Sequence, residues 1–200
     1  MTYLLRISVS PRGTGSHSRR FADRVAENML RRHAIGWVVL RDITGSSIPC
    51  IDGAYVQAML AHTSREASSD VAALQLSEQL IEELDEANAL LIDTPVHNYT
   101  VPAALKTWID QVVRVGRTFK STPAGKAGTL RDRPTVVVSA SGGFFSGNAA
   151  QPDFFAPYLD AVLATIGIRS VRHIRLEGLT RGDDAVRAAY ARADQELSSL

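Results

Sequence analysis

The sequence has little cysteine, almost no excess charge of either sign and no long apolar run. Its one cysteine, Cys50, excludes an intramolecular disulfide and a zinc site built from thiolates. Lysine and arginine total 22 against 21 for aspartate and glutamate, so a net charge of +1 gives no strong field to attract nucleic acid. The N-terminus has the pattern of a strand rather than a charged leader. We therefore expect a cytoplasmic protein that binds neither nucleic acid nor a membrane.

The 200 residues alternate between two kinds of segment. Short apolar runs predict five strands, and amphipathic stretches with apolar residues every three or four positions predict the helices between them. The predicted strands span 3–8, 36–40, 89–93, 135–139 and 171–176, and the predicted helices span 18–32, 66–86, 103–115, 158–166 and 183–198. With 45% hydrophobic residues, no repeats and no linker, residues 1–200 are expected to form one domain.

Strands that alternate with helices predict a parallel sheet covered on both faces, because each crossover helix packs onto the sheet. We expect an α/β three-layer sandwich whose five-stranded sheet has the flavodoxin-like order 2-1-3-4-5. In such a sheet the ligand crevice lies at the carboxyl ends of strands 1, 3 and 4. Three loops, at 8–18, 94–99 and 139–147, should therefore meet in space.

The first loop, SVSPRGTGSHS over residues 8–18, has the composition of an anion site. Its two glycines permit tight turns before a helix whose first N–H groups and positive dipole end are unsatisfied. Ser10, Ser16 and Ser18 add hydroxyl donors, whereas the Gly-Lys-Ser/Thr ending of a triphosphate loop is absent. The pattern indicates a cup for one phosphate monoester, such as that of FMN. The alternative is a plain turn followed by a helix cap at Ser16.

The second loop follows the third predicted strand and is stiffened by prolines. Its five residues at the crevice are Pro95, Val96, His97, Asn98 and Tyr99. Backbone amides and the Asn98 side chain can serve the polar edge of an isoalloxazine ring, and His97 could donate a proton to an acceptor. The alternative is a rigid strand-to-helix turn whose polar residues face solvent.

The third loop leaves the fourth predicted strand. Its five residues at the crevice are Ser139, Ala140, Ser141, Gly142 and Gly143. The two glycines would let the main chain approach a flat ligand, and their N–H groups could donate to it. Phe144 and Phe145, which come next, could cover a ring or could be ordinary packing under the loop. Each loop is a weak indication alone, and their coincidence at three crevice positions is a stronger one.

Almost the whole chain resembles the FMN-dependent NADH-azoreductase family and the related flavodoxin-like NAD(P)H quinone reductases. The stretches that carry the resemblance are the serine loop, PVHN, VPAALKTWIDQVVRVGRTFK, SASGG and PYLDAVLATIGI. The resemblance implies that the phosphate is held by Ser10, Ser16, His17 and Ser18, that the ring is bordered by Val96, His97, Asn98 and Tyr99, and that its polar edge is lined by Ser139 to Gly143. The family usually has tyrosine in place of His97 and histidine in place of Phe144, and both positions face the substrate.

The activity implied by the resemblance is a two-electron, ping-pong reduction of quinones and azo compounds, in which NADH or NADPH passes hydride through N5 of bound FMN. No side chain is needed as a nucleophile, so we expect no catalytic residue and no metal ligand. The family also implies a homodimer with its flavin sites near the subunit interface. Segment 44–66 could cover the site, with Tyr55 or Met59 touching substrate, or could be an elaborated connection.

Two other functions stay open on the sequence. A flavin-binding electron carrier or sensor would need the same cup without oxidising NADH. A phosphate-ester hydrolase would use Cys50 as its nucleophile, but the sequence CIDGAYV lacks the arginine that a thiolate phosphate cradle needs five residues later.

Overall fold

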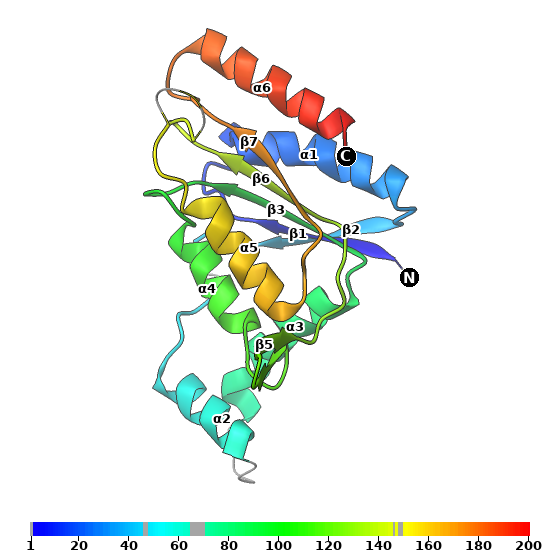
Figure 1. The fold of residues 1–200 in the computed structure, drawn as a ribbon, viewed down its shortest axis with the longest axis vertical. Helices are drawn as coiled ribbons and strands as arrows, with labels where there is room; N and C mark the ends of the chain where they lie inside the picture. The colour runs from blue at the N-terminus through cyan, green and yellow to red at the C-terminus, as the bar shows by residue number, and fades with distance from the viewer. Residues whose placement is uncertain (1, 46–47, 65–70, 146, 148–149) are drawn as a thin grey trace.

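The computed structural model describes residues 2–45, 48–64, 71–145, 147 and 150–200. Helices lie on both faces of one parallel sheet (Figure 1). The strands of this sheet are β1 (Tyr3–Ser8), β2 (Trp37–Asp42), β3 (Ala89–Pro95), β6 (Thr135–Ala140) and β7 (Val171–Leu176). The helices are α1 (His17–Arg32), α2 (Gly53–Ser64), α3 (Val71–Glu86), α4 (Ala103–Val112), α5 (Phe155–Ile166) and α6 (Asp183–Ser198). A 3₁₀ turn, η1 (Gly13–Gly15), and a hairpin of β4 (Phe119–Thr122) and β5 (Gly125–Gly128) complete the described elements.

The order of the strands confirms the predicted topology. The sheet runs β2-β1-β3-β6-β7, and all of its pairings are parallel. Counted among themselves, these strands have the order 2-1-3-4-5. The chain moves outward from β1 to β2 and then returns to β3 on the other side of β1. The carboxyl ends of β1, β3 and β6 consequently border the crevice where such sheets bind their ligands.

The sheet has two apolar layers because successive side chains of a strand point to opposite faces. Leu4 joins a layer beneath α1 and α6, together with Phe21 and Ala189. Leu5 joins the layer beneath α3, α4 and α5, together with Trp108. The central strands are buried on both faces, which explains why their sequences are continuous apolar runs.

Three predicted helices have bounds that differ by more than one residue in the structure. The helix predicted over 158–166 begins at Phe155. The helix predicted over 66–86 has its described part at Val71–Glu86, and residues 65–70 lie outside the described residues. The helix predicted over 103–115 ends at Val112. It ends there because the N–H of Arg114 donates to Oγ1 of Thr118, 2.9 Å away, instead of continuing the helical ladder.

The sequence patterns did not predict helix α2 or the β4–β5 hairpin. Helix α2 lies inside the segment expected as a cover or connection, and Asp52 caps it by accepting the N–H of Tyr55 at 2.8 Å. The β4–β5 hairpin follows α4 and turns at Gly125, whose φ of +110° favours glycine. Among the described residues, no helix is both long and apolar enough to cross a membrane.

Candidate functional site

The three predicted loops meet around one cavity of about 250 Å³ at the carboxyl edge of the sheet. The cavity is lined by Ser10, Arg12, Ser16, His17 and Ser18 of the first loop, by Pro95, Val96 and His97 of the second, by Ala140, Ser141 and Gly142 of the third, and by Leu179 and Thr180. We call this cavity the cup. Ten of the residues predicted for the site line it, from three segments far apart in the chain.

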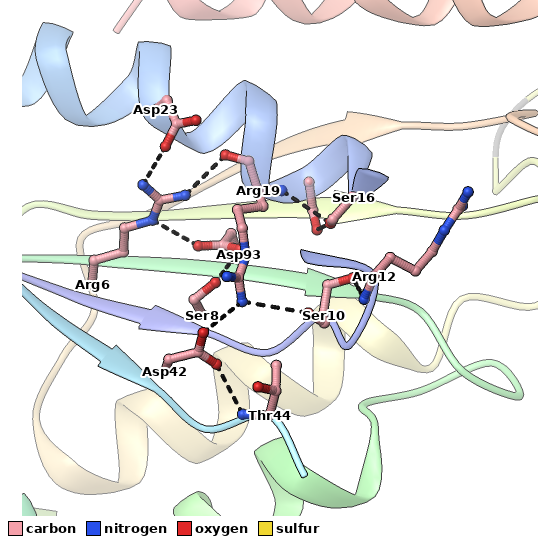
Figure 2. Close-up of polar contacts among 11 residues, drawn as sticks. Arg6, Ser8, Ser10, Arg12, Ser16, Arg19, Asp23, Asp42, Thr44 and Asp93 are labelled. Carbon is pink, nitrogen blue, oxygen red and sulfur yellow. Dashed lines mark hydrogen bonds and ion pairs between the residues drawn. The ribbon is translucent and has the colours of Figure 1, made fainter. Parts of the chain in front are cut away.

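The serines of the first loop are almost fully buried at the start of α1. Ser10, Ser16 and Ser18 expose 3%, 2% and 0% of their surface. Oγ of Ser16 accepts the N–H of Arg19 at 3.3 Å and lies 3.1 Å from Oγ of Ser18 (Figure 2 labels Ser16). Ser16 is therefore the N-cap of α1 as well as a wall of the cup.

The helix mouth keeps donors that the protein does not use. Within the described part of the chain, the N–H groups of His17 and Ser18 donate to no acceptor. These two amides, the serine hydroxyls and the positive end of the α1 dipole all serve the cup. Arg12 adds a cation at its rim. Such a donor set fits a single phosphate monoester, because hydrogen bonds can hold it without a lysine.

His17 lines the cup, and its ring also contacts α6. Its Nδ1 lies 3.2 Å from the hydroxyl of Tyr190 on α6 and 3.1 Å from the guanidinium of Arg20. Burial lowers the pKa of His17, and the nearby Arg20 and Arg12 lower it further. The lowered pKa favours the neutral ring, whose Nδ1 contacts Tyr190 and Arg20, and the backbone N–H of His17 stays open to the cup.

The second loop is a strained two-residue turn. His97 and Thr100 exchange backbone hydrogen bonds of 2.9 and 3.0 Å, and between them Asn98 and Tyr99 have φ values of +46° and +73°. Positive φ is tolerated by asparagine but is costly for tyrosine, by about 1–3 kcal/mol for such strain. The N–H of Val96 donates to the carbonyl of Ala140 at 2.9 Å, which joins this loop to the third.

Asn98 and Tyr99 line a second, open cleft of about 700 Å³ rather than the cup. The other walls of this cleft are Thr100, Phe154, Pro157 and Tyr158. His97 lines the cup and Asn98 lines the cleft, so the two spaces adjoin along one loop.

The third loop is held by bonds within the protein. Ser139 is buried in β6, and Oγ of Ser141 donates to the carbonyl of Gly143 at 2.9 Å. A Cβ on Gly142 would lie 2.9 Å from Cγ2 of Thr180, and one on Gly143 would lie 1.6 Å from Nε2 of Gln151. The main chain at both glycines thus lies close to neighbouring side chains of the same chain.

Phe144 and Phe145 follow the packing alternative of the sequence analysis. The ring of Phe144 lies against Gly178, where a Cβ would come within 2.4 Å of it. The ring of Phe145 lies 5.9 Å from the guanidinium carbon of Arg175. Both rings thus pack against other residues of the same chain.

Segment 44–66 does not cover the cup in the described chain. Figure 1 shows α2 at the end of the molecule beyond α3 and α4, away from the three loops. Tyr55 and Met59 line a different cavity, of about 410 Å³, between α2, α4 and α5. Cys50, the candidate nucleophile of a hydrolase, is exposed and is not among the residues that line the cup.

A doubly wound sheet with an anion cup at the carboxyl end of β1 defines a flavodoxin-like protein. The chain belongs to the family with the flavodoxin-like fold, whose model matches residues 2–200.

Named relatives are similar over their whole length. FMN-dependent NADH:quinone oxidoreductase 2 of Cupriavidus pinatubonensis is 46% identical, over 100% of this chain and 98% of that protein. FMN-dependent NADH:quinone oxidoreductase 4 of Pseudomonas fluorescens is 44% identical, over 99% and 95%. An azoreductase structure from Bacillus anthracis superposes with a TM-score of 0.86 at 22% identity, covering 100% of this chain and 98% of that one, which supports the fold.

Proposed function

We propose that the protein is an FMN-dependent oxidoreductase that uses NADH or NADPH to reduce quinones and azo compounds by two electrons. The observation that carries this proposal is that three loops meet around a cup, where two backbone N–H groups are free to donate hydrogen bonds to a phosphate. The full-length similarity to FMN-dependent NADH:quinone oxidoreductases, at 44% and 46% identity, supports the same activity.

In this proposal the chain binds and orients the cofactor. Ser10, Ser16 and Ser18, with the N–H groups of His17 and Ser18, hold the phosphate. The turn from Pro95 to Tyr99 and the loop from Ser139 to Gly143 border the ring. When bound, FMN supplies the two-electron chemistry between the pyridine nucleotide and the acceptor. No side chain of the cup is assigned a covalent role.

The test is a visible spectrum of the purified protein followed by anaerobic titration with NADH. We expect a flavin spectrum that bleaches with one equivalent of NADH and returns when a quinone is added. Bound FMN that does not oxidise NADH would favour an electron carrier or sensor. A colourless protein that takes up no added FMN would contradict the proposal.

We also propose that residues 1–200 form one FMN-binding domain that acts as a homodimer in the cytoplasm. An apolar surface supports the dimer. On it Val56 exposes 38% of its surface, Tyr99 48% and Phe154 60%, and these residues line the two cavities that share Tyr158. Trp108 and Phe155, by contrast, are buried in the chain's own core.

The dimer is tested by light scattering during size-exclusion chromatography. Two chains per particle are expected for the wild type, and one chain for Phe154→Glu, because a carboxylate would be buried on the apolar surface. A monomeric wild type would contradict the dimer without affecting the FMN proposal. Cell fractionation tests the location.

A further inference from the structure

A buried ion pair lies beneath the cup, and the mechanism proposed above does not use it. Arg6 on β1 exposes 8% of its surface, and Asp93 on the adjacent β3 exposes 0%. Nε of Arg6 donates to Oδ2 of Asp93 at 2.8 Å, and the Ser8 hydroxyl donates to Oδ1 at 2.8 Å. Burial raises the pKa of the Asp93 carboxyl, and the guanidinium of Arg6 opposes that shift.

Burying such an ion pair in the centre of a sheet costs free energy, because both charges lose their hydration. Removing two charges from water costs several kcal/mol per ion, and well-packed apolar residues in their place are often neutral or stabilising. Leu5 and Ile7 on either side of Arg6, and Ile92 before Asp93, are buried apolar residues that need no such pair. The other contacts of the pair suggest what it is for.

The guanidinium of Arg6 also reaches the first turns of α1. Its terminal nitrogens donate to Oδ1 of Asp23 at 2.6 Å and to the backbone carbonyl of Arg19 at 2.9 Å. Arg19 is the residue whose N–H is held by Oγ of Ser16. Figure 2 shows the chain of contacts from Asp93 through Arg6 to the helix mouth.

A second arm of the network reaches Ser10. The guanidinium of Arg19 donates to Oδ2 of Asp42 at 2.9 Å and to the backbone carbonyl of Ser10 at 3.4 Å. Oδ1 of Asp42 accepts the N–H of Thr44 at 3.0 Å. The network thus joins the ends of three strands to the helix mouth on which the cup is built.

The network acts through position more than through charge. Two arginines, Arg6 and Arg19, face three carboxylates, Asp23, Asp42 and Asp93, so the five groups together add no positive field to attract a phosphate. Donors aimed at a ligand are most effective when their positions are fixed before it binds.

We propose that Arg6 and Asp93 are positioning residues for the phosphate cup, fixing the first turn of α1 against the ends of β1 and β3. This role rests on the proposed function, in which the cup holds the phosphate of FMN. It predicts that loss of the pair weakens the binding of FMN but not of riboflavin, which has the same ring without the phosphate.

The test compares the dissociation constants of FMN and riboflavin, measured by fluorescence titration. In Arg6→Met/Asp93→Leu both buried charges are removed together, so the apo protein should fold, with a melting temperature lowered by the Ser8 hydroxyl's loss of its acceptor. We expect its FMN affinity to fall at least ten-fold and its riboflavin affinity to change less than two-fold. A general structural role would weaken both flavins alike.

A matched control removes another ion pair that contains a buried arginine. Arg114 exposes 2% of its surface, donates to the Ser77 hydroxyl at 2.9 Å and is paired with Glu78, at the far end of α4 from the cup. Arg114→Met/Glu78→Gln should leave the ratio of FMN to riboflavin affinity unchanged. A ratio changed as much in this control as in the Arg6 variant would overturn the role.

A milder variant covers the case in which the double variant does not fold. Arg6→Lys keeps a cation beside Asp93 but cannot also reach Asp23 and the Arg19 carbonyl. We expect at least a three-fold loss of FMN affinity with riboflavin binding unchanged, and an unchanged FMN affinity would overturn the role. A wild type that binds riboflavin as tightly as FMN would overturn the phosphate cup as well, and one that binds neither flavin would overturn the proposed function.

Discussion

The two edges of the central sheet carry similar polar groups but satisfy them differently. At the amino edge, the buried guanidinium of Arg133 donates to the carbonyl of Ala87 at 2.8 Å and to that of Leu84, near the end of α3. Beside it, Asp132 accepts the N–H groups of Arg169 and Ser170 at 2.8 and 3.0 Å. At the carboxyl edge, the N–H groups of His17 and Ser18 at the start of α1 have no acceptor in the part of the chain that the structure describes.

This difference in how polar groups are paired indicates which edge of the sheet is suited to a ligand. A buried polar group without a partner is costly, so proteins usually pair such groups internally. The amino edge follows that rule, because Arg133 and Asp132 pair with backbone groups of the chain itself. The carboxyl edge leaves donors open to the cup, and Arg6 ties the first turns of α1 to Asp93 on β3.

The largest effect is expected from Ser16→Ala/Ser18→Ala, which removes hydroxyls from the carboxyl edge. Each lost hydrogen bond to the phosphate costs about 1.5–3 kcal/mol, so FMN should bind roughly 100-fold to 10,000-fold more weakly. Ser16 also caps α1, so stability should fall by about 1 kcal/mol. Fluorescence titration measures the first effect and thermal unfolding the second.

The control for that variant is Ser198→Ala/Ser199→Ala, at the end of α6, where both hydroxyls bond to backbone carbonyls on an exposed surface. It should leave FMN binding unchanged. Undiminished FMN affinity in the Ser16/Ser18 variant would count against the cup.

Arg133→Met at the amino edge is expected to lower stability without changing FMN binding. Losing the guanidinium leaves buried carbonyls near the end of α3 without donors, at a cost of about 3 kcal/mol. For a chain of this size the melting temperature should fall by about 6–12 °C, with the FMN dissociation constant of the folded protein unchanged. The neighbouring exposed Arg131→Met is the matched control and should change stability by less than about 0.5 kcal/mol. Loss of FMN binding in folded Arg133→Met would break the distinction between the edges.

A smaller effect is expected from Asp132 as the pH falls. Hydrogen bonds from the backbone N–H groups of Ser170 and Arg169 lower its pKa from 3.8 to about 2. Because the folded pKa lies below the unfolded one, the stabilisation is present above about pH 4 and is lost as the pH falls towards 2.

Since this carboxylate is exposed, we expect Asp132→Asn to lose about 1 kcal/mol at pH 6, a difference that narrows towards pH 2. Urea unfolding at several pH values measures it. A constant difference across that range would show that Asp132 does not titrate as described.

The smallest effect is expected from His97→Ala. The side chain is exposed in the cup, and among the described residues its ring has no hydrogen-bond partner to orient it. A general acid contributes about 100-fold to 10,000-fold. We expect quinone turnover to change less than about three-fold, with His33→Ala as an exposed control. A hundred-fold loss with FMN still bound would make His97 the proton donor.

The sheet order and the meeting of the loops were predictable because they depend on local patterns. Continuous apolar runs marked the strands, and the alternation with helices left few topologies. Helix α2 was missed because its apolar residues are spread around the helix instead of forming one stripe. The capping Asp52 was the available indication of where it begins.

Long-range contacts explain what could not be predicted. The ring of His17 contacts the hydroxyl of Tyr190, which is 173 residues later in the chain. Arg6 and Asp93 are 87 residues apart, so no local pattern links them. Their one indication in the sequence was the presence of a charged residue, Arg6, inside the apolar run of the first strand.

The central claim is that the mouth of α1 binds the phosphate of the flavin. The most direct measurement is the affinity of the wild-type apo protein for FMN and for riboflavin under the same conditions. Two charge-assisted hydrogen bonds at about 1.5 kcal/mol each predict that FMN binds at least about 100-fold more tightly. Equal affinities would contradict the claim.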